Sequence, residues 1–327
     1  MKILIIGLGS MGSRRIRCLQ SLGYSDLTGY DIRDDRRENA NKQYGIRTVQ
    51  LFNSQIISQF DVVIVSTPPD LHAFYVEQAI QYGKPTFLEA SVVIEDVLKI
   101  QKANIKNVFV APSCTMVFHP AIKSIKEIIT SGKYGHVTNF SYHSGQYLPD
   151  WHPWEKMSDY YVSNRETGAA REIVPFELTW IVNIFNFPEE IIGLYGKYTN
   201  LPIKIDDVYT CILRYKNFLG TLTVDVTSRF ATRSLIFNLE NAQIRWSWEE
   251  KSIKIYEVKS NKWLIIKQPE FKAHNNYNEN IGEQMYIDEI KSFLNGITDN
   301  QCYPNTIEKD IKVLRLLNQI EINSLKN

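Results

Sequence analysis

The chain has 327 residues, of which 44% are hydrophobic and 22% are charged, a composition typical of a globular protein with a buried core. Its 37 basic and 36 acidic side chains leave a formal net charge of +1, which excludes the broad basic surface of a nucleic-acid-binding protein. Apolar runs stay below the roughly 18 residues of a membrane span, and the first one stops at Gly7, too early for a signal peptide. We therefore expect a cytoplasmic protein without nucleic-acid or membrane partners.

The sequence contains four widely separated cysteines and no CxxC pair: Cys18, Cys114, Cys211 and Cys302. This spacing indicates neither a disulfide framework nor a zinc site, and we expect ordinary buried thiols. The remaining histidines outside the motifs discussed below, His136, His143 and His274, lie far apart in the sequence. The sequence therefore predicts no metal site.

The first third of the chain alternates short β-rich runs with stretches that carry apolar residues at helical spacing. The predicted strands are 2–6, 27–31, 61–66, 85–88 and 107–111. The predicted helices between them are 10–22, 33–43, 70–82 and 94–104. Strands that are apolar on both faces and separated by helices predict an α/β domain with a doubly wound parallel sheet, which we assign to residues 1–118.

The pattern changes after residue 118. Residues 190–267 carry alternating runs separated by turn signals, such as DVYTCILRY and LGTLTVDVTSRF, which predict antiparallel strands. The other predicted elements are helix 120–131, strand 135–147, helix 172–186 and the closing helices 279–296 and 305–323. We predict an α+β domain over residues 119–327 for substrate binding and oligomerisation, with a large, mostly antiparallel open sheet and a C-terminal helix that can pack back on the first domain.

Three glycines stand in GxGxxG spacing directly after the first predicted strand: Gly7, Gly9 and Gly12. Glycines in this position allow a tight turn and the close approach of a pyrophosphate, and the following helix offers its N-terminal N–H groups to the anion. An acid about 20 residues further on accepts the ribose 2′-OH, and Asp31 has this place at the end of the second strand. The spacing predicts a dinucleotide site; the alternative is a glycine-rich turn beside a solvent-facing Asp31.

Asp31 also bears on the choice of cofactor. Its carboxylate would repel the 2′-phosphate of NADP, which favours NAD. Arg33, Arg36 and Arg37 follow closely and would accept that phosphate if they turned inward. We predict NAD, with NADP as the alternative.

The motifs GLGSMGSRR (7–15), VVIVSTPPDLH (62–72), YGKPTFLEA (82–90) and MVFHPAIKSIKEII (116–129) resemble the glucose-fructose oxidoreductase, inositol dehydrogenase and MocA family. The resemblance extends along the whole chain and implies a Rossmann domain followed by the α+β domain. It implies hydride transfer between a nicotinamide and a sugar or cyclitol carbon, in a cleft between the two domains. The predicted cofactor-binding residues are Gly7, Gly9, Ser10, Met11, Gly12, Asp31, Arg33, Thr67, Pro68, His72 and Glu89.

Two family signatures are altered. Relatives usually carry Glu-Lys-Pro where this chain has Glu89-Ala90-Ser91, so the lysine near the reacting carbon is absent. Because a cis Ala-Ser peptide would cost about 2.5–4 kcal/mol, we expect a trans bond here. In ETGAAREIVPFELTW (166–180), Glu172 stands at the usual aspartate position and Phe176 at the usual histidine position, whereas a one-residue shift would put Glu177 where the base belongs.

Replacement groups are concentrated in and after the aromatic segment 145–168, GQYLPDWHPWEKMSDYYVSNRETG. Aromatic faces stack on sugars, and arginine grips phosphate or hydroxyl groups; the alternative is a lid that packs on the second domain. The predicted catalytic residues are His152, Glu172 and Tyr160, and the predicted substrate-binding residues are Tyr147, Trp151, Arg165 and Arg171.

Two functions follow from these observations. The first is an NAD-dependent dehydrogenase or reductase acting on the CH–OH group of a sugar, sugar phosphate or nucleotide sugar, as in surface-glycan synthesis. The second is a catalytically idle NAD- and sugar-binding sensor, which Ala90 and Phe176 favour. In either case we expect a homodimer or homotetramer built on the open face of the second sheet.

Overall fold

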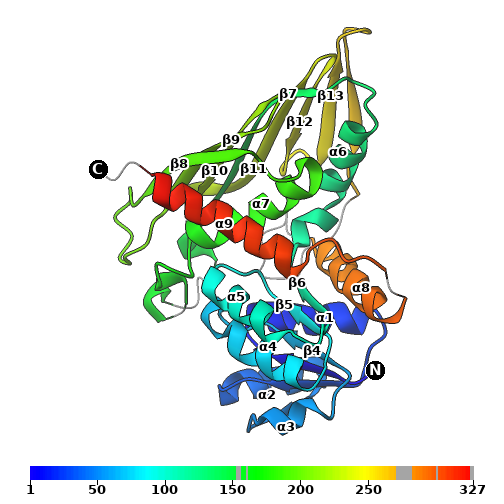
Figure 1. Ribbon diagram of the computed structural model, residues 1–327, viewed down its shortest axis with the longest axis vertical. Coiled ribbons are helices and arrows are strands. Elements are labelled where there is room, and N and C mark those ends of the chain that lie inside the picture. Colours follow the sequence, from blue (N-terminus) through cyan, green and yellow to red (C-terminus); the bar gives the residue numbers. More distant parts are fainter. Residues whose placement is uncertain (152–155, 160, 270–281, 300, 325–327) are drawn as a thin grey trace. The chain divides into compact units, whose positions relative to one another are not determined.

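The structure is a computed structural model that describes residues 1–151, 156–159, 161–269, 282–299 and 301–324 (Figure 1). The chain forms two compact units. The first consists of Met1–Thr115 and Gln284–Leu314, and the second of Met116–Glu283 and Arg315–Asn327. The C-terminal third of the chain therefore contributes to both units.

The first unit contains a six-stranded parallel sheet in the order β3-β2-β1-β4-β5-β6. Its strands are β1 (Ile3–Ile6), β2 (Leu27–Tyr30), β3 (Arg47–Val49), β4 (Val62–Val65), β5 (Thr86–Leu88) and β6 (Val110–Pro112). The residues of β1, β4 and β5 are all buried, as expected for strands covered on both faces. The predicted doubly wound sheet is confirmed, and β3 is an addition that the sequence pattern did not reveal.

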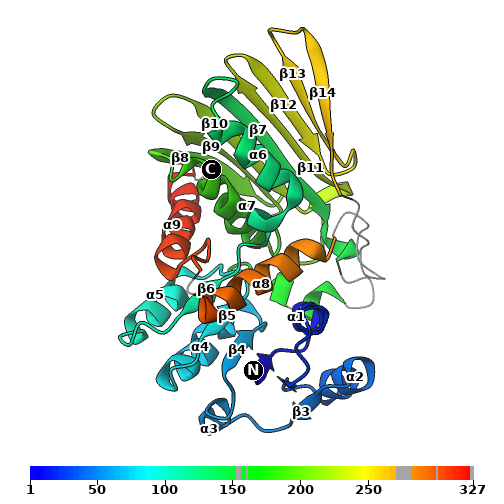
Figure 2. The ribbon, with the colours of Figure 1, turned by 90° about the vertical axis from the view of Figure 1, so that its right-hand side faces the viewer.

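Helices cover both faces of this sheet, with α1 next to α8 and α4 next to α5. Figure 2 shows these two pairs on opposite sides of the strands. The helices of the unit are α1 (Ser10–Ser21), α2 (Asp34–Tyr44), α3 (Ser54–Ile57), the short η1 (Pro69–Leu71), α4 (His72–Gln81), α5 (Ile94–Ala103) and α8 (Gln284–Thr298). Helix α9 (Ile307–Asn323) contributes Ile307, Ile311 and Leu314, which lie on one of its faces, to the core formed with α4 and α5.

The second unit contains an eight-stranded mixed sheet in the order β14-β13-β12-β11-β7-β10-β9-β8. Its strands are β7 (Val137–Tyr147), β8 (Glu190–Gly196), β9 (Val208–Arg214), β10 (Leu219–Asp225), β11 (Thr227–Leu239), β12 (Ala242–Ser247), β13 (Ser252–Glu257) and β14 (Lys262–Lys267). The β7–β10 pair is parallel and the other pairs are antiparallel. The predicted large, mostly antiparallel sheet is confirmed.

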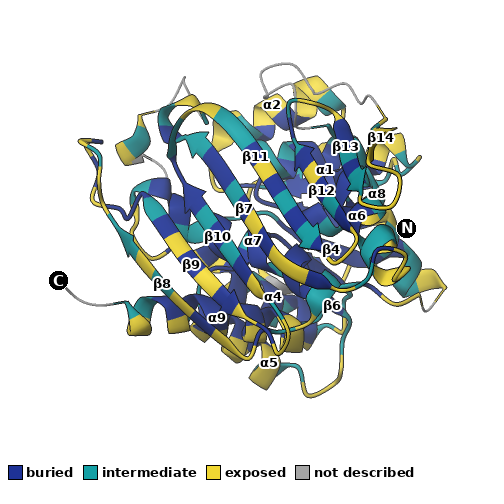
Figure 3. Cartoon of the chain, turned by 90° about the horizontal axis from the view of Figure 1, so that it is seen from above, coloured by how far each residue is buried: buried dark blue, intermediate teal, exposed yellow. Residues whose placement is uncertain are grey.

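Side chains alternate between the two faces of this sheet. In β7, Phe140, Tyr142 and Ser144 are buried, whereas Ser141 and His143 point to the other face and remain partly or fully exposed. The helical elements of the unit are η2 (Thr115–Phe118), α6 (Pro120–Thr130), η3 (Leu148–Asp150), η4 (Met157–Asp159), η5 (Tyr161–Ser163) and α7 (Ala170–Phe185). Figure 3 looks onto the open face, where exposed bands cross β8 and β9.

None of the helices in the described residues is long and apolar enough to cross a membrane. Within the same residues, no group of three His, Cys, Asp or Glu side chains is placed to hold a metal ion. Cys18, Cys114 and Cys211 are buried thiols, as predicted. The prediction is wrong for Cys302, which is exposed because it lies in the connection between α8 and α9.

Candidate functional site

The glycine turn between β1 and α1 tolerates no side chain at two of its positions. Gly7 has φ +90°, and a Cβ added to it would lie 2.5 Å from the carbonyl oxygen of Ser66. A Cβ on Gly12 would lie 1.8 Å from the carbonyl oxygen of Gly7. Glycine therefore lets α1 start directly against the end of β1. Gly9, the N-cap of α1, provides no capping side chain, so the helix N-terminus suits a phosphate group.

Asp31 lies directly after β2 and fixes this turn from the side. Its Oδ2 accepts a hydrogen bond from the Leu8 N–H at 2.7 Å, and its Oδ1 accepts one from the Arg33 N–H at 2.9 Å. The residue is only 4% exposed. A carboxylate placed beside the turn at the end of β2 fits the ribose of a dinucleotide.

The three arginines after Asp31 have different surroundings. The Arg33 guanidinium forms a bidentate ion pair with the exposed Asp35. Arg37 is buried and donates to the Asp31 carbonyl and to Asp34. The Arg36 guanidinium lies 3.5 Å from the Asp31 carboxylate and beside Gly9. Of the three, Arg36 is therefore the one placed to meet a ligand group at the turn.

The segment after β5 carries Glu89, whose carboxylate is bound by a buried arginine. Arg15 donates from Nε to Glu89 Oε1 at 2.6 Å and from Nη2 to Oε2 at 2.8 Å, and Ser66 Oγ donates to Oε1 at 3.2 Å. The Glu89-Ala90-Ser91 peptide bonds are trans, as predicted, since no described peptide bond is cis. Arg15 does not replace the missing lysine as a free cation, because its charge is already paired.

The connection after β4 is held by His72. This buried imidazole faces the Thr67 carbonyl oxygen at 2.9 Å, and we infer that it donates its Nε2 hydrogen. Burial lowers the pKa of His72, so the ring is neutral at physiological pH. His72 thus orders the turn containing Thr67 and Pro68, at the carboxyl end of β4, without adding charge to it.

In the second unit, Glu172 lies in the first turn of α7. Tyr161 donates its hydroxyl hydrogen to Glu172 Oε1 at 2.9 Å, whereas the buried Oε2 has no hydrogen-bond partner among the described residues. Burial raises the pKa of Glu172 to about 8, partly opposed by the Tyr161 hydrogen bond. The carboxyl group is therefore mostly protonated at neutral pH, the state expected of a general acid.

The turn before α7 is strained. Ala169, the N-cap, has φ 59° and ψ −135°, a region that non-glycine residues rarely adopt. Gly168 is packed so closely that an added Cβ would lie 2.4 Å from Val162 Cα in η5. The turn and η5 together hold Tyr161 against Glu172, and such strain is common at functional sites.

Both predicted substrate-binding arginines have carboxylate partners in the second unit. Arg165 donates to both oxygens of Asp206, at 2.7 and 3.2 Å. Arg171 donates to both oxygens of Glu321, at 2.7 and 3.0 Å, and to the Glu166 carbonyl. A substrate anion would have to compete with these ion pairs.

The predicted aromatic residues are placed as follows. Tyr147 ends β7, and Trp151 follows η3, half-buried, with an indole N–H that has no partner among the described residues. His152 and Tyr160 lie outside the residues that the structure describes, so their roles remain predictions.

Sequence reasoning missed Arg229, whose guanidinium lies over the Tyr147 ring at 3.9 Å from the centroid. It stands where the register of β11 against β7 shifts, between Thr227 and Thr232.

Asp225 anchors the start of this bulge by accepting hydrogen bonds from Thr227 and Ser228 and from the His143 ring at 2.6 Å. Burial opposes ionisation, but these hydrogen bonds lower the pKa of Asp225 to about 2. Bulges often re-aim side chains near sites, yet no sequence motif marks this one.

A one-residue shift of the family signature in α7 would place Glu177 at the position of the catalytic base. This fully buried carboxylate accepts hydrogen bonds from Tyr142, Ser144 and Trp180 and pairs with Arg233 at 2.8 Å. With its oxygens bound on all these sides, Glu177 fits a structural ion pair better than a base. Phe176 lies one turn after Glu172 and is half-buried.

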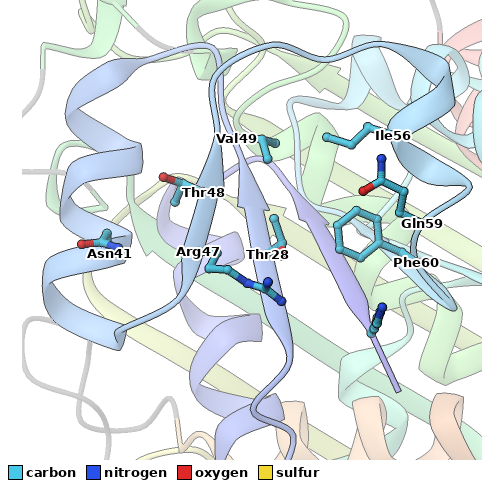
Figure 4. Close-up of a pocket in the computed structure, with 9 residues that line it drawn as sticks. Thr28, Asn41, Arg47, Thr48, Val49, Ile56, Gln59 and Phe60 are labelled. Carbon is cyan, nitrogen blue, oxygen red and sulfur yellow. The ribbon is translucent and has the colours of Figure 1, made fainter.

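A pocket of about 480 Å³ lies elsewhere in the first unit (Figure 4). Its lining includes Lys2, Thr28 and Arg47, at the amino ends of the first three strands, and Gln59 after α3. The glycine turn and Asp31 lie at the opposite, carboxyl ends of the strands. This pocket is therefore separate from the candidate dinucleotide site.

Comparison with known proteins agrees with this geometry. Residues 1–107 match the oxidoreductase family with an NAD-binding Rossmann fold, and residues 122–245 match the GFO/IDH/MocA C-terminal domain. An uncharacterized oxidoreductase of Schizosaccharomyces pombe is 23% identical over 179 residues, which are 52% of this chain and 46% of that protein. The match thus spans about half the length of that relative.

Similar solved structures share the fold at low identity. An oxidoreductase from Agrobacterium radiobacter, in complex with NAD+, L-tartaric acid and magnesium, is 14% identical with a TM-score of 0.85, covering 99% of this chain and 96% of its own. Levoglucosan dehydrogenase with NADH and levoglucosan is 15% identical with a TM-score of 0.83, covering 99% and 97%. UDP-N-acetylglucosamine 3-dehydrogenase from Acidithiobacillus ferrooxidans is 15% identical with a TM-score of 0.78, also covering 99% and 97%.

The two family matches cover more than half of the chain and agree with the glycine turn, with Asp31 and with both sheets. The chain therefore belongs to the GFO/IDH/MocA family of oxidoreductases with an NAD-binding Rossmann fold.

Proposed function

We propose that this protein is an NAD-dependent oxidoreductase that transfers a hydride between the cofactor and a CH–OH carbon of a sugar, sugar phosphate or nucleotide sugar. The observation that carries the proposal is the turn at Gly7 and Gly12, which has no room for a side chain and is fixed by Asp31. The choice of substrate class is supported by two similar structures, a levoglucosan dehydrogenase and a UDP-N-acetylglucosamine 3-dehydrogenase.

The residues of this chain have distinct roles in the proposal. The N-terminus of α1 holds the pyrophosphate, and Asp31 accepts a hydroxyl hydrogen of the adenosine ribose. The bound cofactor supplies or accepts the hydride. Glu172, protonated below a pKa of about 8, donates a proton to the substrate oxygen during reduction and accepts one during oxidation at higher pH. His152 and Tyr160 are further candidates for this proton transfer, and Tyr147, Trp151, Arg165 and Arg171 for substrate binding.

A substrate panel tests the proposal. The purified protein is mixed with NAD+ and with anhydrosugars, sugar phosphates and nucleotide sugars, and the formation of NADH is followed by absorbance. At least one compound should give turnover that depends on protein concentration. If no compound supports hydride transfer while some of them shift the affinity for NAD, the protein is a sensor and the enzyme proposal is wrong.

We predict that NAD(H) binds more tightly than NADP(H). The Asp31 carboxylate lies beside the glycine turn and would repel a 2′-phosphate, and Arg36 already lies close to that carboxylate. Titration of both cofactors by intrinsic fluorescence measures the difference, and Asp31→Asn should narrow it. Tighter NADP(H) binding by the wild-type protein would instead indicate that Arg36 binds the 2′-phosphate. In that case Arg36→Gln should remove the preference for NADP(H).

We also propose a homo-oligomer built on the open face of the second sheet. Four large apolar side chains on β8, β9 and β10 are 44–55% exposed: Ile192, Leu194, Ile212 and Leu219. An apolar group of this kind usually marks an interface. Light scattering at micromolar concentration should give a multiple of the 38.0 kDa chain mass, and Ile212→Glu should reduce it. A monomer mass for the wild-type protein would contradict the proposal.

A further inference from the structure

The first unit contains a buried cluster of three charges that connects the segment after β5 with helix α8. Arg15 lies on α1 and is fully buried, between Glu89 and Glu289. It forms two hydrogen bonds with Glu89, and its Nη1 lies 2.9 Å from Glu289 Oε2. Glu289 lies about 200 residues beyond Glu89 in the sequence, and no motif marks it.

Glu289 is itself held from several directions. Its Oε1 accepts hydrogen bonds from the Cys114 N–H at 2.6 Å and from Ser113 Oγ at 2.9 Å. Its Oε2 accepts one from Thr115 Oγ1 at 2.8 Å. The Glu289 side chain is 0% exposed, so the carboxylate has little freedom to move. Arg15 is therefore bound to an anchor at the carboxyl end of β6.

Glu89 differs from Glu289 because part of it reaches the surface. Its side chain is 10% exposed, and Arg15 and Ser66 occupy only some of the positions where its two oxygens can accept a hydrogen bond. One arginine shared by two carboxylates also leaves the cluster with a formal charge of −1. The exposed part of the Glu89 carboxylate can therefore accept a hydrogen bond from a ligand.

The sheet order indicates which part of a dinucleotide would reach this carboxylate. The order β3-β2-β1-β4-β5-β6 reverses direction between β1 and β4, and ligands bind beyond the carboxyl ends at such a switch point. Asp31, after β2, lies on the adenosine side of the glycine turn. Glu89, after β5, lies on the other side, toward which the second ribose and the nicotinamide extend.

We propose that Arg15 and Glu289 are positioning residues, which act through Glu89 on the nicotinamide half of the cofactor. The proposal rests on the proposed NAD site and extends that site to α8. Glu289 holds Arg15, and Arg15 holds the Glu89 carboxylate in a fixed orientation. Glu289 touches neither substrate nor cofactor in this arrangement.

The test compares ligands that contain different parts of the cofactor. ADP reaches only the adenosine side, whereas NADH also reaches Glu89. We expect Glu89→Gln and Glu289→Gln each to raise the dissociation constant of NADH about tenfold, the effect of one good hydrogen bond, while that of ADP changes less than about twofold. NADH binding is measured by its fluorescence and ADP binding by calorimetry, on the full-length protein.

Two further variants separate positioning from loss of stability. If Glu289 acts through Glu89, the double variant should bind NADH about as weakly as Glu89→Gln alone. Glu177→Gln is the matched control, because it replaces the carboxylate of another buried Glu–Arg pair, in the second unit. It should lower the melting temperature without changing the ratio of the two dissociation constants.

Several results would overturn the inference. The first is an unchanged affinity of Glu289→Gln for NADH, and the second is an equal loss of ADP and NADH affinity in the single variants. The third is a double variant whose NADH dissociation constant rises by the product of the two single increases. A wild-type protein that binds neither ADP nor NADH would instead contradict the proposed cofactor site itself.

Discussion

Replacing Glu172 with Gln is expected to lower turnover by about 10²–10⁴ while the affinity for NAD stays the same. Gln keeps the shape of the side chain and can still accept the Tyr161 hydrogen bond, but it can neither give nor take a proton. Steady-state kinetics on the substrate found in the panel measures the loss, and NADH fluorescence measures the affinity. Glu166→Gln, an exposed carboxylate before the same helix, is the control and should leave both unchanged.

The same variant should be more stable than the wild-type protein, in a manner that depends on pH. Burial raises the pKa of Glu172 from its ordinary 4.5 to about 8 in the folded protein. Between these values the folded protein binds more protons than the unfolded chain, so this group lowers stability as the pH rises from about 4.5 to 8. The melting-temperature advantage of Glu172→Gln should grow across that window and level off above it. A constant advantage would contradict the raised pKa.

Other substitutions show whether Glu172 is sufficient. His152→Ala, in the segment outside the described residues, is predicted to lower turnover by a similar factor. Ala90→Lys, which restores the usual family lysine, should raise turnover little if, as predicted, Phe176 stands at the usual histidine position. If Glu172→Gln and His152→Ala both keep full activity, the proton carrier lies elsewhere.

Replacing Arg233 with Met should lower the free energy of unfolding by about 3–5 kcal/mol, the largest stability effect that we predict. The reason is that Glu177, which is 0% exposed, would lose its positive partner and remain as a buried charge. Burial and the charge of Glu177 raise the pKa of Tyr142, so the Tyr142 hydroxyl stays protonated and donates to Glu177. This neutral hydroxyl cannot replace the positive charge of Arg233. Denaturant unfolding monitored by circular dichroism measures the change.

Two controls accompany this measurement. Adding Glu177→Gln to Arg233→Met should restore part of the stability, because the unpaired charge is then removed. Arg214→Met removes the partner of the exposed Glu189 and Glu190 and should change stability little, since solvent screens surface pairs. If Arg233→Met is no more destabilising than Arg214→Met, the buried pair of Arg233 and Glu177 does not contribute the predicted stability.

Most of the fold could be predicted from local patterns. The apolar runs of β1 and β4 and the periodic helices between them determine a parallel sheet, because such strands must be covered on both faces. The short β3 and α3 were missed because three or four residues carry too little periodicity. The glycine turn could also be predicted, since the backbone there has no space for a side chain and so restricts the residue type directly.

Charged side chains were harder to assign, because their role depends on partners that are distant in the sequence. Arg171 resembles a substrate-binding residue by its position, but it pairs with Glu321, 150 residues away. Arg165 likewise pairs with Asp206, whereas Arg229, with no motif around it, lies over Tyr147. A sequence shows that a charge is present, but only the folded chain shows what neutralises it.

The sequence by itself thus determined the two sheets and the dinucleotide turn, because steric and hydrophobic restrictions act on neighbouring residues, and the family was indicated by the resemblance of its motifs. The tertiary structure alone decided the environment of each ionisable group. It buries Glu172 enough to raise its pKa, surrounds Glu177 with donors and connects Glu89 to α8 through Arg15. Desolvation and ion pairing depend on atoms brought together from distant parts of the chain, so no local pattern contains them.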